Sequence, residues 1–422
     1  HGTRGRTKAH GPHRRTSQQS KPNNNTQTRA SSSSRDLDYP EDPPMSASDE
    51  IDRHVTRKYD IVQKLGKGAY GIVWRATDRR TKDVVALKKI FDAFQNATDA
   101  QRTFREVMFL QEMKGHEHIV SLLNVLKADN DRDIYLVFEH METDLHAAIR
   151  ANILQDVHKQ YIMWQALKAL KFMHSANLLH RDMKPSNLLL NSDCLMKVAD
   201  FGLARSMHEP KEDAEEQRYF TDYIATRWYR APEILLGSNN YSEAVDMWGV
   251  GCILGEIVCG KPVFAGSSTI QQLELVCDLI GLPDWDREQM ERCSPYTNQM
   301  LQNLNVSNPR GVSHSEWCNR FPGASDKALD LLKKLLKFDP AERINAHDAL
   351  KHPYLEQFHD EHVEREAPVK VKVSIPDNEK RSTNHYRERL YKEVAEFRKL
   401  EKAESEHGGG GGRGRKNASP IM

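Results

Sequence analysis

The sequence lacks the features that define several large protein classes. Its 6 cysteines show no C-x-x-C pair and no zinc-ligand spacing, which argues against a disulfide scaffold and predicts free thiols in a reducing compartment. Uncharged apolar stretches such as 247–255 are far shorter than the roughly 18 residues of a membrane span, and no signal peptide can be read. A formal net charge of +1 argues against a dedicated nucleic-acid or membrane-surface binder. We therefore expect a cytoplasmic or nuclear protein with neither a nucleic-acid nor a membrane partner.

Composition changes along the chain separate a folded part from its tails. The 422 residues are enough for one bilobal domain with tails or for two ordinary domains. Hydrophobic residues make up 38% and charged residues 29%, which favours a soluble chain with disordered portions. The chain begins with His1 rather than Met, and Met45, the first methionine, is a candidate translation start. The expected regions are a disordered N-terminal extension (1–54), a small lobe with a hinge (55–141), a larger lobe (142–358), a C-terminal extension (359–400) and a flexible Gly/Arg tail (401–422).

Hydrophobic periodicity predicts an α+β fold with a β-rich small lobe and a helical large lobe. Residues 98–113 have a helical pattern that opens with Thr98-x-x-Gln101, a capping-box signature. From 145 to 358 the pattern is mostly helical, and the C-terminal extension ends in a charged helical run, 385–400. Strand-like runs occupy 60–65, 71–77, 84–90, 120–127 and 134–139.

A G-x-G-x-x-G pattern marks the turn between the first two strands. Glycines allow backbone N–H groups to close over phosphates, but the pattern alone also fits a dinucleotide-binding fold or a plain glycine turn. A dinucleotide fold needs a helix directly after the glycines, whereas 72–77 continues as a strand. The pattern therefore predicts a β-hairpin flap over nucleotide phosphates. Its members are Leu65, Gly66, Lys67, Gly68, Ala69, Tyr70, Gly71, Ile72 and Val73.

A lysine on the next strand offers a point charge for the phosphates. Lys88 ends a Val-Ala-Leu-Lys run, and it needs an anion to hold it in place. Glu106 on the predicted helix is the candidate, because it lies beside the apolar stripe that begins at Phe104. The plain alternative is an exposed lysine next to Lys89. We expect the Lys88–Glu106 ion pair.

Two acidic motifs further along supply the remaining chemistry. In the run 180–187, Asp182 can orient a hydroxyl and accept its proton, and Lys184 can place a cation near the migrating phosphoryl group. Asn187 and Asp200 offer the oxygen ligands that Mg²⁺ prefers when water and phosphate fill its other positions. Both motifs, in this order and after a glycine hairpin, predict phosphoryl transfer with ATP and Mg²⁺.

At these residues the sequence resembles the eukaryotic protein kinases over about 59–358. Ala231-Pro-Glu233, Asp246 and Arg343 complete the order of motifs typical of that family. The resemblance implies that Glu233 pairs with Arg343 and that Asp246 braces the loop around Asp182. It also implies an ATP pocket, with adenine at the hinge backbone and Phe138 as the gatekeeper behind it. Its further residues are Ala86, Glu139, Met141, Asp144 and Leu189, with Val73 above the ring.

Within that family the chain resembles the mitogen-activated protein kinases. The residues that carry this resemblance are Thr221-Asp-Tyr223, the segment that follows it to Glu233, and the hinge-like run 139–145. The runs 88–94, 98–106, 131–138 and 375–391 are similar to the atypical extracellular signal-regulated kinase seven/eight branch, in which the central letter is Glu rather than Asp. The resemblance implies a monomeric Ser/Thr kinase and adds the cytoskeleton and the cilium as expected locations.

The same resemblance implies control by phosphorylation within an activation loop, 200–233. Phosphate adds negative charge that guanidinium groups bind well. Phospho-Thr221 is expected to join Arg105, Arg181 and Arg205. Phospho-Tyr223 is expected to pair with Arg227 and Arg230 and to shape a pocket for proline after the acceptor residue. Substrates would then be proteins with Ser/Thr-Pro sites, and the branch is associated with autophosphorylation.

Several alternatives remain beside this interpretation. A pseudokinase scaffold would have lost the lysine, the base or the metal ligand, and all of these are present. A cyclin-dependent-type kinase shares 225–233 but not the Thr-x-Tyr motif. The acidic run 360–366, with Asp360 and Glu361, is either a docking patch for basic partners or a plain solvated surface. Residues 129–133 imitate a calcium loop without its glycine and predict a hairpin turn instead.

Overall fold

The computed structural model describes residues 50–68, 71–207, 227–372, 374–375 and 380–407, with side chains up to 399. All of these except Glu50 belong to one compact unit, 51–422. The predicted N-terminal disorder before residue 50, the Gly/Arg tail from 408 on, and the predicted phosphorylation sites lie outside the described residues. No helix among the described residues is long and apolar enough to cross a membrane.

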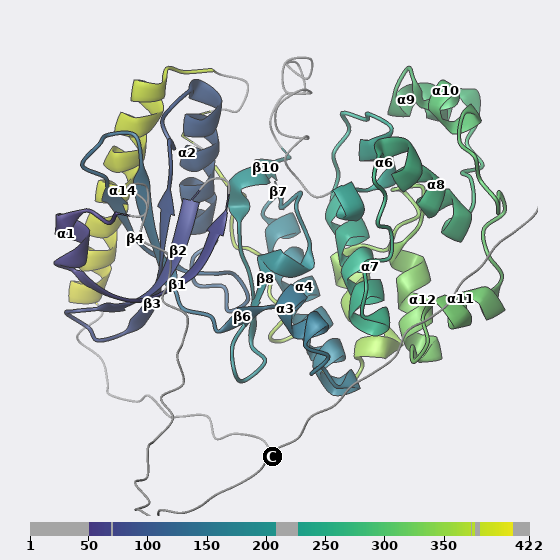
Figure 1. The fold of residues 1–422 in the computed structure, drawn as a ribbon, viewed down its shortest axis with the longest axis horizontal. Helices are drawn as coiled ribbons and strands as arrows, with labels where there is room; N and C mark the ends of the chain where they lie inside the picture. The colour runs from purple at the N-terminus through teal and green to yellow at the C-terminus, as the bar shows by residue number, and fades with distance from the viewer. Residues whose placement is uncertain (1–49, 69–70, 208–226, 373, 376–379, 408–422) are drawn as a thin grey trace, which may run out of the picture. The chain divides into compact units, whose positions relative to one another are not determined.

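The small lobe is built on a five-stranded antiparallel sheet with the strand order β1-β2-β3-β5-β4 (Figure 1). All five strands predicted from the sequence are present, and only β4 starts two residues later than expected. Side chains alternate between the faces of β2, so that Ile72 and Trp74 are buried in the lobe while Val73 lies on the opposite face. The strands are β1 (Tyr59–Gly68), β2 (Gly71–Asp78), β3 (Val84–Ile90), β4 (Leu122–Lys127) and β5 (Ile134–Glu139).

The predicted helix of the small lobe is α2, Ala97–Glu112. The predicted capping box at Thr98 is wrong. Asn96 caps the helix instead, because its side-chain oxygen accepts a hydrogen bond from the backbone N–H of Asp99 at 3.0 Å. The N-cap therefore lies two residues before Thr98, and the helix begins one residue before the predicted range 98–113.

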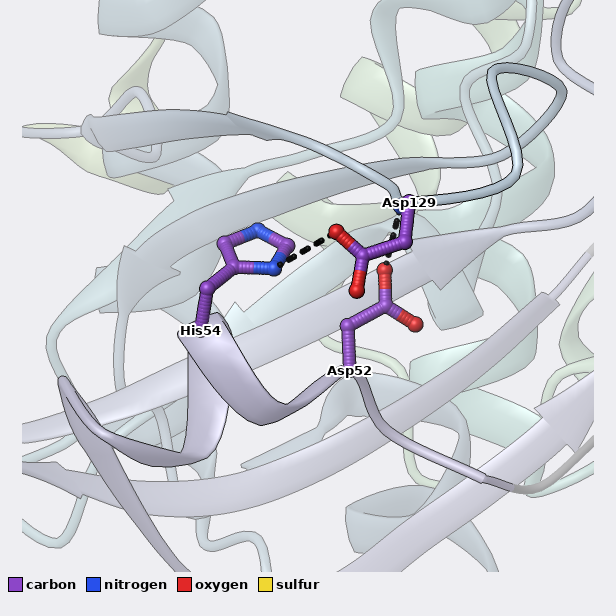
Figure 2. Close-up of side chains that lie close together, drawn as sticks. All are labelled: Asp52, His54 and Asp129. Atoms are coloured by element: carbon purple, nitrogen blue, oxygen red, sulfur yellow. Dashed lines mark hydrogen bonds and ion pairs between the residues drawn. The ribbon is translucent and has the colours of Figure 1, made fainter.

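The turn between β4 and β5 is tied to the short helix α1 (Arg53–Thr56), as Figure 2 shows. The Asp129 backbone N–H donates to Asp52 Oδ2 at 2.7 Å, and His54 Nδ1 lies 3.2 Å from Asp129 Oδ1. The run 129–133 is thus a hairpin turn, as predicted, and it fastens the start of the folded domain to the sheet.

The large lobe is helical around two long buried helices. Helix α4 (Asp156–Ser175) and helix α7 (Ala244–Cys259) pack on each other, and almost every residue of α7 is buried. Helix α12 (Asp326–Leu335) buries an apolar stripe that includes Ala328, Leu331 and Leu335. The other α-helices are α3 (Leu145–Arg150), α6 (Pro232–Leu235), α8 (Thr269–Ile280), α9 (Arg287–Cys293), α10 (Thr297–Gln302), α11 (His314–Arg320), α12 (Asp326–Leu335), α13 (Ala346–Leu350) and α14 (Thr383–His407).

Short strands and 3₁₀ turns of the large lobe shape the edge that faces the sheet. Strands β6, β8 and β9 form one small sheet, and β7 pairs with β10 in another. The strands are β6 (Thr143–Asp144), β7 (Leu178–Leu179), β8 (Leu188–Leu190), β9 (Met196–Val198) and β10 (Arg205–Ser206). The 3₁₀ turns are η2 (Pro185–Asn187), η3 (Phe201–Leu203), η5 (Arg227–Tyr229) and η6 (Pro353–Leu355).

The acidic run 360–366 does not form one exposed patch, which corrects part of the sequence-based interpretation. Glu364 is 2% exposed and accepts a hydrogen bond from Trp164 Nε1 at 2.8 Å. Glu361 is exposed but pairs with Lys351 at 3.1 Å. Asp360 and Glu361 thus remain the acidic groups at this surface that a partner could reach, together with Glu366.

A buried ion pair joins α6 to the segment after α12, as the resemblance implied. Arg343 Nη1 and Nη2 donate to the two Glu233 carboxylate oxygens at 3.0 and 3.1 Å, in a bidentate arrangement. Because both side chains are almost fully buried, removing one leaves the other charged and unpaired. We expect Glu233→Ala to lower the free energy of unfolding by about 3–5 kcal/mol in urea titrations.

The matched control is the exposed pair Arg287–Glu291, in which Arg287→Ala should leave that free energy nearly unchanged. Equal effects for the two variants would contradict the assignment of Glu233–Arg343 as a structural bridge.

Candidate active site

The edge of the five-stranded sheet and the large lobe enclose a cavity of about 510 Å³. That volume lies within the range of small-molecule sites. Apolar side chains cover its walls, and charged groups converge at one end. The lining residues are Leu65, Gly66, Val73, Ala86, Lys88, Glu106, Val120, Phe138, Glu139, Met141, Glu142, Thr143, Asp144, Ser186, Asn187, Leu189, Ala199 and Asp200.

The predicted ion pair between β3 and α2 is present in the cavity. Lys88 Nζ lies 2.8 Å from Glu106 Oε1, and the Glu106 side chain is only 6% exposed. Burial alone would lower the pKa of Lys88. The carboxylates of Glu106 and Asp200 outweigh burial, so the pKa is raised above its ordinary value of 10.5. Lys88 is therefore a fixed cation, which excludes the plain exposed-lysine alternative.

The catalytic-loop residues converge on Asp182. Lys184 Nζ lies 2.5 Å from Asp182 Oδ2, and Asn187 Nδ2 donates to the same oxygen at 3.0 Å. Asn187 also donates to the Asp182 carbonyl oxygen at 2.8 Å, which fixes its amide group. The Asp182 carboxylate is thus held by two donors while its other oxygen stays available for a substrate hydroxyl.

Helix α7 holds the catalytic loop from behind, as the resemblance implied for Asp246. Its carboxylate accepts from the backbone N–H groups of His180 at 2.9 Å and Arg181 at 2.7 Å. His174 Nε2 lies 3.0 Å from the same carboxylate. Arg181 has a φ of +66°, a strained conformation for a residue with a side chain, and these two bonds help to hold it there.

Asp200 stands at the start of η3 in the left-handed region, with a φ of +63°. Burial would raise the pKa of its carboxyl. Lys88, Arg102 and Lys184 outweigh burial, so the pKa lies below the ordinary value of 3.8. Lys88 and Lys184 come from different lobes. Because both lysines lower the pKa of Asp200, this candidate metal ligand lies close to predicted catalytic residues of both lobes.

The lowered pKa of Asp200 has a consequence for stability. A depressed pKa in the folded state contributes stability that is present above the ordinary value of 3.8 and is lost as pH falls through the folded value. The difference in free energy of unfolding between wild type and Asp200→Asn should thus stay constant from about pH 8 to about pH 5. Urea titrations across this range check it, and a difference that shrinks between neutral pH and pH 5 would contradict the electrostatics described above.

Most of the predicted nucleotide-binding residues line the cavity, but only some residues of the glycine hairpin do. Leu65, Gly66 and Val73 line it, whereas Lys67, Gly68 and Gly71 do not. The prediction for Ile72 is wrong as far as its side chain is concerned, because it is fully buried in the small-lobe core. Strand alternation sends neighbouring side chains to opposite faces. Ala69 and Tyr70 lie outside the described residues.

The hinge carries the predicted gatekeeper, and two residues outside the hinge that sequence reasoning missed also line the cavity. Phe138 lines the cavity and packs against the main core. Glu139 also lines the cavity, but its carboxylate is bound to other groups. It accepts a hydrogen bond from the Ser121 backbone N–H at 2.7 Å and pairs with Lys197 at 3.0 Å. Val120 and Ala199 also line the cavity. They form part of an apolar wall, and no local motif marks them.

The arginines expected to bind phosphate are described, although Thr221 and Tyr223 are not. Arg105 is buried on α2, and Arg181 Nη1 donates to the Leu203 carbonyl at 3.4 Å while its guanidinium lies 4.0 Å from the Tyr241 ring centre. Arg205 Nη1 donates to the Ala204 carbonyl at 2.7 Å. Arg227 Nη1 donates to the Ser267 carbonyl at 3.2 Å, so this arginine is directed toward the start of α8. Arg230 is half-buried directly after η5.

The residues present fit a nucleoside triphosphate with a divalent cation. The cavity has an apolar wall for a flat base and a fixed ammonium, Lys88, for phosphate oxygens. At its charged end it offers one ionised carboxylate, Asp200, and one amide oxygen, Asn187. Few protein oxygens beside substrate phosphates are the ligand set that Mg²⁺ prefers.

Comparisons with known proteins identify the family of this chain. The model of the protein kinase domain matches residues 59–355. Extracellular signal-regulated kinase 2 of Dictyostelium discoideum is 59% identical over 84% of this chain and 95% of its own length. Mitogen-activated protein kinase 15 of Xenopus laevis is 52% identical over 82% of this chain, which spans 58% of that relative. Extracellular signal-regulated kinase 7 of Drosophila melanogaster is 46% identical over 81% of this chain and 37% of its own length. The chain therefore belongs to the protein kinase family and, within it, to the mitogen-activated protein kinases, which are serine/threonine protein kinases.

Proposed function

We propose that this chain transfers the γ-phosphoryl group of ATP, with Mg²⁺, to serine or threonine residues that precede proline in proteins. The observation that carries the proposal is that Lys88, Asn187 and Asp200 line one cavity, while Asn187 donates a hydrogen bond to the Asp182 carboxylate beside it. In that arrangement Asp182 orients the acceptor hydroxyl and takes its proton as the hydroxyl oxygen bonds to the γ-phosphorus. The bond between that phosphorus and the β–γ bridging oxygen breaks, and ADP leaves. Lys88 binds phosphate oxygens, held in place by Glu106. Lys184 lies beside Asp182, where it can stabilise charge on the migrating group.

Asn187 and Asp200 would hold the divalent cation, which supplies positive charge at the phosphates. Two hydrogen bonds from Asn187 Nδ2 to Asp182 orient the amide group and leave its oxygen available for the ion. Asp200 stays ionised because neighbouring cations depress its pKa. The alternative is a pseudokinase scaffold, but no residue needed for the transfer is missing from the sequence.

The preference for proline after the acceptor is tested with a pair of peptides. We expect a Ser-Pro peptide to show a kcat/KM at least about tenfold above that of the same peptide with Ser-Ala, because a site shaped for proline discriminates by about 1.4 kcal/mol or more. Equal values for both peptides, with transfer still dependent on Asp182, would retain the kinase and remove the proline preference.

Activation by phosphorylation of Thr221 and Tyr223 is part of the same proposal, with autophosphorylation as the route. Phosphate on these residues would bind guanidinium groups of the arginines named above. Mass spectrometry of protein made in bacteria should find both phosphates on wild type and neither on Asp182→Asn. Both phosphates on the Asp182→Asn protein, or neither on active wild type, would contradict self-activation.

Two exposed acidic residues on the large lobe support a docking site for basic partners. Asp360 and Glu361 are exposed acids at one edge of the large lobe. Charge reversal of both should weaken capture of a basic peptide at low salt and leave turnover of a short substrate peptide unchanged. Unchanged capture would reduce the pair to an ordinary solvated surface.

A further inference from the structure

Three side chains that can bind a metal ion meet outside the nucleotide cavity, where the chain enters the small lobe. Asp52 and His54 come from the segment before β1, and Asp129 comes from the turn between β4 and β5. Figure 2 shows the three side chains turned toward one another. One ligand atom of each lies within 4.8 Å of those of the other two. None of the three residues lines the nucleotide cavity.

The closest pair of ligand atoms already has the spacing of a metal site. His54 Nδ1 lies 3.2 Å from Asp129 Oδ1. Two ligands of a tetrahedral Zn²⁺ ion with bonds of about 2.0–2.1 Å lie about 3.3–3.4 Å apart. An ion can therefore bridge the imidazole of His54 and the carboxylate of Asp129 with little change in their positions.

Two polar groups of this cluster lack the hydrogen bonds that their positions would suggest. Asp52 is the N-cap residue of α1, but its side chain makes no cap hydrogen bond and extends toward Asp129 instead. His54 Nδ1 is shielded from solvent and, although it lies beside Asp129, makes no hydrogen bond of suitable geometry. A shielded imidazole nitrogen that faces two carboxylates is arranged as a metal ligand.

Neighbouring hydrogen bonds hold the cluster in this arrangement. The Asp129 backbone N–H donates to Asp52 Oδ2 at 2.7 Å. The Asp52 backbone N–H donates at 3.2 Å to the hydroxyl of Tyr135, whose side chain is fully buried in the small lobe. Metal ligands in proteins are commonly oriented by such outer contacts. The Asp129 side chain is 74% exposed, so an ion can reach the cluster from solvent.

We propose that Asp52, His54 and Asp129 bind one divalent transition-metal ion, Zn²⁺, with water as the fourth ligand. The imidazole nitrogen favours Zn²⁺ over Mg²⁺ and Ca²⁺, which take oxygen ligands. Two carboxylates balance the charge of a divalent ion, and among the described residues no lysine or arginine pairs with either of them. The ion joins the start of the folded domain to the β4–β5 turn.

Titration of Zn²⁺ alone into the full-length, chelator-treated chain tests the site. Asp129→Asn removes one ligand but keeps the shape of the side chain and the backbone N–H that binds Asp52. Calorimetry should show a Zn²⁺ affinity at least about tenfold lower in Asp129→Asn and in His54→Ala, since loss of even an outer contact typically costs about 10–100-fold. Asp193→Asn, the same substitution in the exposed turn after β8, is the matched control and should bind as wild type does.

Unfolding in urea separates a metal site from a plain ion pair. A site that exists only in the folded chain stabilises it by mass action, so Zn²⁺ should raise the urea midpoint of wild type and of Asp193→Asn. The midpoint of Asp129→Asn should move much less, and EDTA should reverse the shift. A plain His54–Asp129 ion pair would instead give a difference between wild type and Asp129→Asn that Zn²⁺ leaves unchanged, and this result would contradict the proposal.

Two further results would also overturn the metal site. One is equal Zn²⁺ affinity in wild type, Asp129→Asn and His54→Ala, and the other is full displacement of Zn²⁺ by excess Mg²⁺ or Ca²⁺. Phosphate transfer by Asp129→Asn should equal that of wild type, because the cluster lies outside the nucleotide cavity. The Zn²⁺ titration and the kinase assay can therefore fail separately, so the metal site and the proposed function are tested independently.

Discussion

Replacement of Asp182 by asparagine should lower kcat by about a thousandfold, since proton transfer by a positioned group contributes about 10²–10⁴-fold. Asparagine keeps the shape of the side chain but cannot accept the proton of the substrate hydroxyl. The loop itself should survive, because its attachment to α7 runs through the backbone N–H groups of His180 and Arg181. Substrate and ATP should therefore still bind, with KM values near those of wild type.

The measurement is phosphate incorporation into a generic basic protein, followed over time for wild type and Asp182→Asn. Asp193→Asn serves as the matched control, because this exposed aspartate lies in the turn after β8 and outside the cavity. Its activity should equal that of wild type. Comparable rates for Asp182→Asn and wild type would remove Asp182 from the mechanism.

Replacement of Asp200 by asparagine should reduce kcat/KM for ATP about a thousandfold at moderate Mg²⁺, because both the metal and Lys88 lose an anion. An ionised carboxylate is a much stronger ligand for Mg²⁺ than an amide oxygen. Part of the loss should return at high Mg²⁺ concentration, since weaker coordination can be offset by mass action. For Asp182→Asn, by contrast, extra Mg²⁺ should restore nothing.

Steady-state rates over a wide range of Mg²⁺ concentration at fixed ATP check this contrast. A half-saturating Mg²⁺ concentration that is the same for wild type and Asp200→Asn would contradict the metal-binding role. A half-saturating Mg²⁺ concentration that increases in Asp200→Asn and stays at the wild-type value in Asp182→Asn would support separate roles for the two aspartates.

The secondary structure of the small lobe could be predicted because its signals are local. Strands β2 and β3 alternate buried with more exposed positions, and the structure places all five strands within a few residues of the prediction. The start of α2 was misjudged because Thr98 and Asn96 are both good caps in sequence. Only the folded backbone decides which one accepts the N–H of Asp99.

The candidate catalytic residues could be selected from the sequence because each sits in a motif that its chemistry requires. Lys88, Asp182 and Asn187 occur in short runs whose order implies one cleft, although they are far apart in the chain. Motifs did not reveal which neighbours complete the cavity. Val120 and Ala199 are ordinary apolar residues, and only tertiary packing brings them to the wall.

Contacts between distant segments were beyond the reach of the sequence. Glu364 looked like one member of an acidic surface run, but it is buried against Trp164, 200 residues earlier. The charged pattern of 385–400 predicted a helix and gave no hint that this helix, α14, would pack on α2. The run Val107 to Leu110 did carry a signal, since four consecutive apolar residues on one helix cannot all face a single sheet.

The central claim is that Lys88, Asp182, Asn187 and Asp200 form one site for the phosphates of ATP. An acyl-phosphate derivative of ATP tests it directly. The deprotonated fraction of a lysine close to the phosphates attacks the acyl carbon, loses a proton to water and keeps the acyl group as ATP leaves. Mass spectrometry should find the label on Lys88 and Lys184, and excess Mg·ATP should suppress it. Labelling confined to other lysines, or labelling that Mg·ATP does not reduce, would contradict the account.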